Sequence, residues 1–293
     1  MQATTLSVTL AGLDARLVRV EVDSGRGLPA FQLVGLPEAA VRESRVRVRA
    51  ALALMDIDLR EYVVTVNLAP GYLRKSGSSH DLAIAVGTYV AIAELEAPLL
   101  AETLLLGELS LRGDVRPVRG VLPALMGAQR CGLKRAIVPP GNAAEAAAVG
   151  GLEVLVASTL AEVIDALKGE TTLAPAASLA ACRPQRPRLL VDLAEVRGQL
   201  LAKSALEVAA AGSHPLLMIG PPGSGKTMLA RRMPTILPEL TEREALAVTC
   251  IHSVAGLLHS DDGIVLARPM RAPHHTLSSA ALCTPPTGTP LTF

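Results

Sequence analysis

The sequence predicts a mixed α/β protein with two domains. Segments with the period of β-strands alternate with helix-like segments over residues 1–168. A glycine-rich loop near residue 220 follows an apolar run and precedes another helix-like segment. The chain has 293 residues, 50% hydrophobic and 19% charged, so it can bury two ordinary cores.

The first predicted domain, residues 1–168, is rich in strands. Alternating apolar residues predict half-buried strands at 6–10 and 17–22. Apolar runs predict further strands at 62–68, 104–111, 136–139 and 154–156. Helical patterns follow Asp81 and occur at 121–131, 143–148 and 160–167.

A helix is also predicted after Pro37, because proline is tolerated in a first helical turn. Its core face carries Val41, Val48, Leu52 and Met55, spaced by seven, four and three residues. Most arginines of this segment fall on the other faces: Arg42, Arg45, Arg47 and Arg49. They form either a solvated helix surface, which we favour, or a patch that contacts phosphates.

Two segments interrupt this pattern. Residues 69–81 contain Pro, Gly and Ser and are predicted to be a loop, with Asp81 as the cap of the next helix. Residues 169–189, rich in Ala and Pro, are predicted to be a linker. The second domain is then residues 190–293.

Composition excludes several classes of protein. The net charge of +1 argues against a strongly basic DNA-coating chain, and only three tyrosines and two phenylalanines are available for stacking bases. The four cysteines stand far apart, which favours free buried thiols over a zinc or disulfide framework. There is neither a secretory leader nor an apolar run of membrane-spanning length, so we expect a soluble, cytoplasmic protein without a membrane partner.

The strongest motif is a phosphate-binding loop of the form G-x-x-x-x-G-K-[ST]. It consists of Gly220, Pro221, Pro222, Gly223, Ser224, Gly225, Lys226 and Thr227. An apolar strand is predicted before it at 215–219 and a helix after it at 228–232. The glycines let backbone N–H groups face phosphate oxygens, Lys226 reaches the β- and γ-phosphates, and the Thr227 hydroxyl can ligate Mg²⁺. The motif predicts ATP and Mg²⁺ as ligands.

Part of the first domain resembles the Lon-protease catalytic domain, through residues 107–118, the helix after them and residues 136–139. The loop 77–81 lies where that family carries its nucleophilic serine. The resemblance places this serine at Ser79 and the activating lysine at Leu122. A hydroxyl without an adjacent base is a weak nucleophile, so we expect a Lon-like fold without protease activity.

Taken together, the motifs resemble the magnesium-chelatase-like AAA+ ATPases of the ComM/YifB type. They are the phosphate-binding loop with residues 228–240, the Pro-His-His box at 271–276, the segment 191–199 before a helix at 200–211, and the stretches 31–37, 66–70 and 79–82. The resemblance implies an inactive Lon-like domain before an AAA+ module, with Val196 and Gly198 near the adenine. It further implies an ATP-driven homo-hexameric motor on DNA, linked to branch migration during natural transformation.

Residues 228–293 contain no complete hydrolytic machinery. The adjacent acidic pair, Asp261-Asp262, follows no apolar strand, and neither a sensor asparagine nor an arginine finger can be identified. Residues 283–293 depart from the family pattern, so the chain resembles a truncated or frame-shifted product that ends before the acidic Walker-B motif, and a genuine short form is the alternative. We expect it to bind ATP without hydrolysing it. The alternatives are a magnesium-chelatase subunit and a non-catalytic nucleotide-binding or assembly module.

Overall fold

The computed structural model describes residues 1–179 and 191–272 of the chain. These residues fall into two compact units. The first unit contains Met1–Arg183 and Thr249–Gly263, and the second contains Pro184–Val248 and Ile264–Phe293. Each unit is described by itself.

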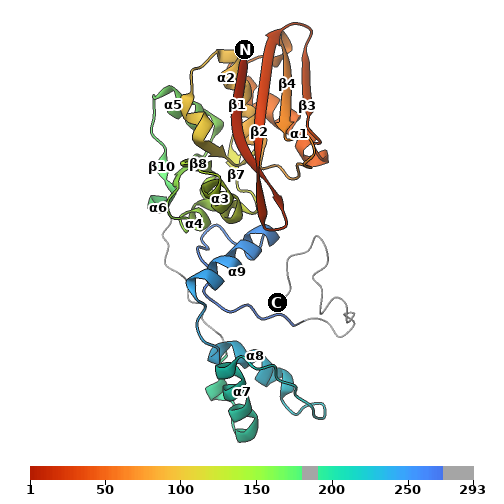
Figure 1. Ribbon diagram of the computed structural model, residues 1–293, viewed down its shortest axis with the longest axis vertical. Helices are drawn as coiled ribbons and strands as arrows, with labels where there is room; N and C mark the ends of the chain where they lie inside the picture. The colour runs from red at the N-terminus through yellow and green to blue at the C-terminus, as the bar shows by residue number, and fades with distance from the viewer. Residues whose placement is uncertain (180–190, 273–293) are drawn as a thin grey trace. The chain divides into compact units, whose positions relative to one another are not determined.

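The first unit is built on a mixed eight-stranded sheet with the order β10-β9-β8-β5-β1-β2-β4-β3 (Figure 1). Its strands are β1 (Gln2–Ala11), β2 (Asp14–Arg26), β3 (Ala30–Val34), β4 (Tyr62–Ala69), β5 (Thr103–Leu105), β8 (Arg135–Val138), β9 (Glu153–Val156) and β10 (Ala174–Pro175). The neighbours β1–β5, β5–β8, β8–β9 and β3–β4 run parallel, and the other neighbours run antiparallel. A separate antiparallel pair is formed by β6 (Glu108–Leu109) and β7 (Val115–Arg116).

The helices of this unit flank the sheet. They are α1 (Ala39–Ala53), α2 (Asp81–Ala93), α3 (Val121–Arg130), α4 (Ala143–Ala146), α5 (Leu160–Lys168), α6 (Ala176–Leu179) and the end of α9 (Glu242–Ala255) from Thr249 onward. Short 3₁₀ turns lie at η1 (Leu59–Glu61), η2 (Pro98–Glu102) and η3 (Pro140–Asn142).

The sheet separates two apolar cores, because successive side chains of a strand point to opposite faces. In β5, Leu105 packs with the α1, α2 and α5 side chains, whereas Leu104 packs with those of α3 and α4. In β9, Leu155 packs against the first of these two cores and Val156 packs into the second. This arrangement confirms the predicted mixed α/β class.

Most of the predicted elements of this unit are present, but the strand predicted at 104–111 is divided. β5 ends at Leu105 and β6 begins at Glu108. Gly107 lies between them and donates its N–H to the carbonyl of Ser79, 3.2 Å away, rather than to a neighbouring strand. This hydrogen bond brings the 76–79 loop beside the end of the strand.

Asp81 is not the cap of α2, contrary to the prediction. The N-cap is His80, and Asp81 is the first helical residue. Its carboxylate turns toward α1 instead and accepts hydrogen bonds from Ser44 and Arg47. Arg47 is therefore neither a solvated nor a phosphate-facing arginine.

The segment predicted as a linker contains folded residues. Ala174 and Pro175 pair with β9, opposite Val156 and Leu155. Ala176, which follows, is only 1% exposed because it packs into the core beside α4. The first unit thus continues beyond residue 168.

The second unit is helical over its described residues. It contains η4 (Leu193–Glu195), α7 (Leu200–Gly212), α8 (Lys226–Ile236) and the beginning of α9. Its small core consists of Leu193, Val196, Leu206 and Leu229. The strand predicted at 215–219 is absent from this described part, where Leu217 is 82% and Ile219 88% exposed. A strand requires a hydrogen-bonded neighbour, and none is described beside this segment.

No described helix has the length and apolarity needed to cross a membrane. The most apolar helix, α2, has 13 residues and is almost entirely buried in the first unit. Of the cysteines in the described residues, Cys250 is buried and free as expected, but Cys131 is exposed.

Candidate functional site

The phosphate-binding loop has the backbone geometry that its glycines predict. Gly223 and Gly225 have φ angles of 80° and 86°, in the left-handed region that favours glycine. Gly225 caps α8, so this helix begins at Lys226. The Leu229 N–H donates to the carbonyl of Gly225 over 2.9 Å and closes the first helical turn. The loop thus leads directly into a helix N-terminus, where free backbone N–H groups favour anions.

The side chain of Lys226 folds back over this loop. Its Nζ donates to the carbonyl oxygens of Gly220 and Pro221, at 2.8 and 2.7 Å, and to Oγ of Ser224 at 3.2 Å. An ammonium group has three hydrogens, so all of its donors are used within the loop. A phosphate that enters the loop would accept these hydrogen bonds in place of the loop oxygens, and its negative charge would lie next to the Lys226 ammonium.

Thr227, the predicted magnesium ligand, is exposed in the first turn of α8. The other predicted residues, Gly220 to Gly225, form the turn before it. The structure therefore brings together every loop residue predicted from the motif. Among the described residues there is no cluster of three or more His, Cys, Asp or Glu side chains that could hold a metal by itself.

Gln199 lies beside this loop, although the sequence analysis did not select it. Its Nε2 donates to the carbonyl of Ser224 over 3.1 Å. Gly198 and Gln199 both have positive φ angles, of 69° and 57°, and this turn directs the Gln199 side chain toward the loop. The signal in the sequence was the Gly-Gln pair directly before α7.

The two residues predicted to lie near the adenine have different environments. Gly198 is exposed, whereas Val196 is only 4% exposed and packs against Leu229 of α8 in the small core. A charged pair reinforces this packing. Arg232 of α8 contacts Glu195 at 2.9 Å and donates to the carbonyl of Asp192 at 2.8 Å. The Arg232 guanidinium lowers the pKa of Glu195 by hydrogen bonding to its carboxylate.

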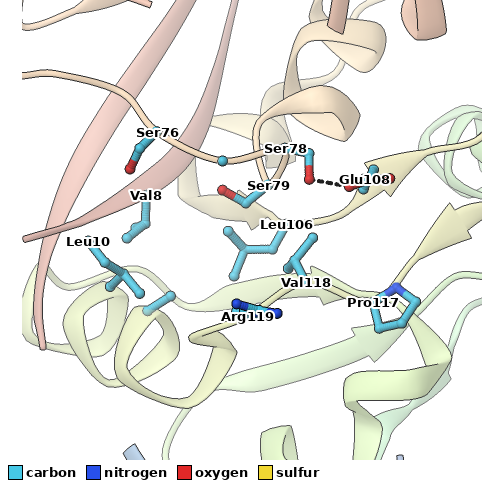
Figure 2. A pocket seen from close by; sticks show the side chains of 12 residues that line it. Val8, Leu10, Ser76, Ser78, Ser79, Leu106, Glu108, Pro117, Val118 and Arg119 are labelled. Atoms are coloured by element: carbon cyan, nitrogen blue, oxygen red, sulfur yellow. Dashed lines mark hydrogen bonds between the residues drawn. The ribbon is translucent and has the colours of Figure 1, made fainter. Parts of the chain in front are cut away.

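A second candidate site surrounds Ser79 in the first unit. The pocket has a volume of about 340 Å³. Ser76, Ser78, Ser79, Glu108 and Arg119 line it together with apolar side chains such as Leu106 (Figure 2). Ser78 donates a hydrogen bond to Glu108. The charged residues that line the pocket are Glu108 and Arg119. No lysine or histidine, the side chains that could activate Ser79, is among the described lining residues.

The residue at the position of the Lon lysine is buried. Leu122 has no exposed surface, and its N–H donates to Glu145 over 3.2 Å. Glu145 also accepts from Asn142 and from Ser253 of α9, each over 2.6 Å. Burial raises the pKa of Glu145, against the opposing effect of these hydrogen bonds. Leu122, at the position of the Lon lysine, therefore has a structural role in the core.

Two buried polar residues that flank the same loop, Lys75 and His80, were not selected as site residues from the sequence. Lys75 is fully buried and donates to the carbonyls of Gly35 and Pro70, and burial lowers its pKa. His80 is fully buried beside Ser7, with 2.9 Å between Nδ1 and Oγ. Burial, together with the charge of Lys75, lowers the pKa of His80 to about 4. These groups hold the 76–79 loop in place rather than facing the pocket.

Two motifs noted in the sequence, the acidic pair and the Pro-His-His box, are not part of either candidate site as described. Asp261 and Asp262 lie in a turn, where Asp262 accepts from the backbone N–H of His259 over 2.8 Å. This placement agrees with the expectation that the pair does not follow an apolar strand. Residues 273–276 of the Pro-His-His box lie outside the described residues.

Known proteins resemble this chain over both units. Two family models match: "Subunit ChlI of Mg-chelatase" over residues 20–142 and "Magnesium chelatase, subunit ChlI" over residues 192–289. An uncharacterized protein of Mycobacterium tuberculosis is 48% identical over 276 residues. Competence protein ComM of Haemophilus influenzae is 40% identical over 275 residues, and the uncharacterized protein YifB of Escherichia coli is 39% identical over 272 residues.

The chain belongs to the magnesium-chelatase-like ComM/YifB family. The matches to these three relatives cover 92–94% of this chain but only 53–54% of each relative. The chain therefore spans about half the length of the curated relatives that it matches.

A more distant similarity concerns Lon proteases. Lon protease 2 of Bacillus subtilis is 31% identical over 146 residues, which are 47% of this chain and 26% of that protein. This match supports the Lon-like character predicted for the N-terminal part of this family member. Family membership implies the use of nucleotide and Mg²⁺ in general, and the loop around Lys226 is the part of the chain that fits them.

Proposed function

We propose that this chain binds ATP with Mg²⁺ through the loop from Gly220 to Thr227. The observation that carries the proposal is the left-handed backbone of Gly223 and Gly225 directly before α8, with the Lys226 ammonium folded over the loop. In this arrangement backbone N–H groups and Lys226 would bind the β- and γ-phosphates. The exposed Thr227 hydroxyl would contribute one oxygen ligand to Mg²⁺.

The segment before α7 would form the adenine side of this site. Its turn at Gly198 and Gln199 is tied to the loop through Ser224, which supports placing the base nearby. Exposed Gly198 leaves room for a flat ring. Val196 would support the base from the core rather than through an exposed surface.

We further propose that the chain hydrolyses ATP poorly. Hydrolysis needs a carboxylate that orients water and an arginine that stabilises the transition state, and the arginine alone contributes about 10³–10⁵ in rate. Among the described residues after the loop, the adjacent acidic pair lies in a turn at Asp261 and Asp262.

In the wider family, the role suggested by the resemblance is that of an ATP-driven homo-hexameric motor that migrates DNA branches during natural transformation. The name of the Haemophilus relative, a competence protein, agrees with such a role. A magnesium-chelatase-type subunit is the second candidate, because both matching family models carry that description. We favour the first candidate, since the ComM and YifB matches run through both units.

Nucleotide binding can be tested with the full chain and a fluorescent ATP analogue, because the protein contains no tryptophan to report binding. Lys226→Ala should abolish binding, since it removes the cation that faces the phosphates. Lys134→Ala is a matched control, because this lysine is exposed in the first unit and forms an exposed ion pair with Glu102. Equal affinity of Lys226→Ala and the parent chain would refute the proposal.

Hydrolysis is measured separately as steady-state phosphate release, with and without DNA. We expect no turnover above background for either the parent chain or Lys226→Ala. A rate of about 1 s⁻¹, ordinary for an enzyme, that disappears in Lys226→Ala would show that a complete hydrolytic site exists.

We also propose that the pocket around Ser79 has no peptidase activity. Neither a lysine nor a histidine is among the described residues that line this pocket, and the carboxylate that lines it, Glu108, accepts a hydrogen bond from Ser78. A serine-directed fluorophosphonate should therefore leave Ser79 unlabelled. Labelling that is lost in Ser79→Ala and kept in Ser76→Ala would contradict this proposal.

A further inference from the structure

The strand β3 forms an open edge of the sheet. It pairs in parallel with β4, with Phe31 opposite Val64, and it is the last strand in the sheet order (Figure 1). No described strand lies on its other side. Natural edge strands are usually protected by charges, prolines or bulges, but residues 30–34 read AFQLV and contain neither a charge nor a proline.

A groove lies between this edge and α1. Its volume is about 750 Å³, and apolar side chains, including Phe31, Val46 and Leu59, line much of it. Val46 is 59% exposed although it lies in a helix that packs on the core. Such a surface next to an open strand edge is suited to an extended chain, which needs both backbone partners and places for alternate side chains.

The charges of the groove all have one sign. Arg45 and Arg49 line it, and no carboxylate lines it among the described residues. Neither arginine has a hydrogen-bond or ion-pair partner within the described part of the chain, in contrast to Arg47, which binds Asp81. Both guanidinium groups remain available to carboxylates of a ligand.

We propose that this groove binds an extended acidic peptide of a partner protein, which adds to β3 as a further strand. The main chain of the peptide would pair with the free edge of residues 30–34. Its apolar side chains would contact Phe31 and Val46, and its carboxylates would meet Arg45 and Arg49.

A peptide fits this surface better than a nucleic acid does. Affinity for nucleic acids depends on several phosphate contacts, and this groove supplies two cations within a largely apolar lining.

The proposal can be tested with the full chain and a fluorescein-labelled peptide in which glutamate alternates with valine. Fluorescence anisotropy should show binding that weakens as salt rises, because exposed ion pairs are screened. The double variant Arg45→Glu/Arg49→Glu should bind about tenfold more weakly and should instead bind a peptide in which lysine replaces glutamate. Arg42→Glu is the control, because Arg42 is exposed on the same helix but does not line the groove.

Two further measurements do not depend on how well the variants fold. In the parent chain, the peptide should slow amide exchange at residues 30–34, and N-methylation of alternate peptide residues should abolish binding. Absence of binding at millimolar peptide would overturn the proposal. So would displacement of the peptide by self-association of the chain, or tighter binding of duplex DNA that is lost in Arg45→Glu/Arg49→Glu.

Discussion

Gln199 and Ser224 join the turn before α7 to the phosphate-binding loop through a hydrogen bond of 3.1 Å between Nε2 and the carbonyl oxygen. Ser224 in turn donates its hydroxyl to the carbonyl of Pro221 over 2.9 Å. The conformation of the loop therefore depends on a residue that precedes Ser224 by 25 positions.

Replacing Gln199 by alanine should weaken nucleotide binding without abolishing it. One hydrogen bond contributes about 0.5–1.5 kcal/mol, so we expect about a threefold to tenfold loss of affinity for a fluorescent ATP analogue. Gln129→Ala is the matched control, since Gln129 makes a comparable bond to the carbonyl of Gly150 in the first unit. An affinity equal to that of the parent chain would mean that this bond does not hold the loop in its binding conformation.

Removing the charge of Asp81 should destabilise the first unit. Asp81 is fully buried and accepts from Arg47, Ser44 and the N–H of Leu109, so Asp81→Asn removes the buried counter-ion of Arg47 and leaves only the exposed carboxylate of Glu43, 3.9 Å away, among the described residues. Breaking a buried ion pair costs about 3–5 kcal/mol. Urea denaturation should show a loss of this size for Asp81→Asn. Glu102→Gln, which disrupts the exposed pair with Lys134, should leave the free energy of unfolding nearly unchanged.

Stability should fall in mild acid because His80 is buried in its neutral form. Its pKa is about 4 in the folded protein, below the ordinary value of 6.5. The unfolded chain therefore binds the proton first as the pH falls. The contribution of neutral His80 to the free energy of unfolding is complete above about pH 6.5. It decreases as the pH falls from about 6.5 to about 4, and the total loss from this one group is about 3 kcal/mol.

This pH dependence can be measured as the urea midpoint between pH 7 and pH 4. The His80→Gln variant should show a shallower fall than the parent chain. His259→Gln should behave like the parent, because the His259 side chain is 88% exposed. Equal slopes in the parent and His80→Gln would exclude a contribution from His80.

The boundary of the first domain can be tested by limited proteolysis. We expect trypsin to cut first after Arg188, since Arg183 and Arg186 are each followed by proline and resist cleavage. Ala174–Leu179 pairs and packs with the first unit, so a stable fragment should end near residue 188 rather than at 168. A stable fragment that ends at Lys168 would show that β10 and α6 do not belong to this fold.

Much of the fold could be predicted from the sequence because its signals are local. The alternating residues of β1 and β2 and the apolar face of α1 depend on neighbours within a few positions. The strand β3 was missed, since its five residues lie between glycines and a proline and lack a long alternating pattern. The segment 215–219 has the composition of a strand, but its pairing depends on residues far away in the chain.

The sequence by itself determined the candidate nucleotide site, because the loop from Gly220 to Thr227 obtains its shape from its own glycines and the helix that follows. Only the tertiary structure decided which arginine of α1 is structural and which are free. Arg47 meets Asp81 across 34 positions, while Arg45 and Arg49 face a groove formed with β3. The sequence shows that all three arginines lie on one helical segment. The role of each charge depends on which residue of another element folding brings close to it.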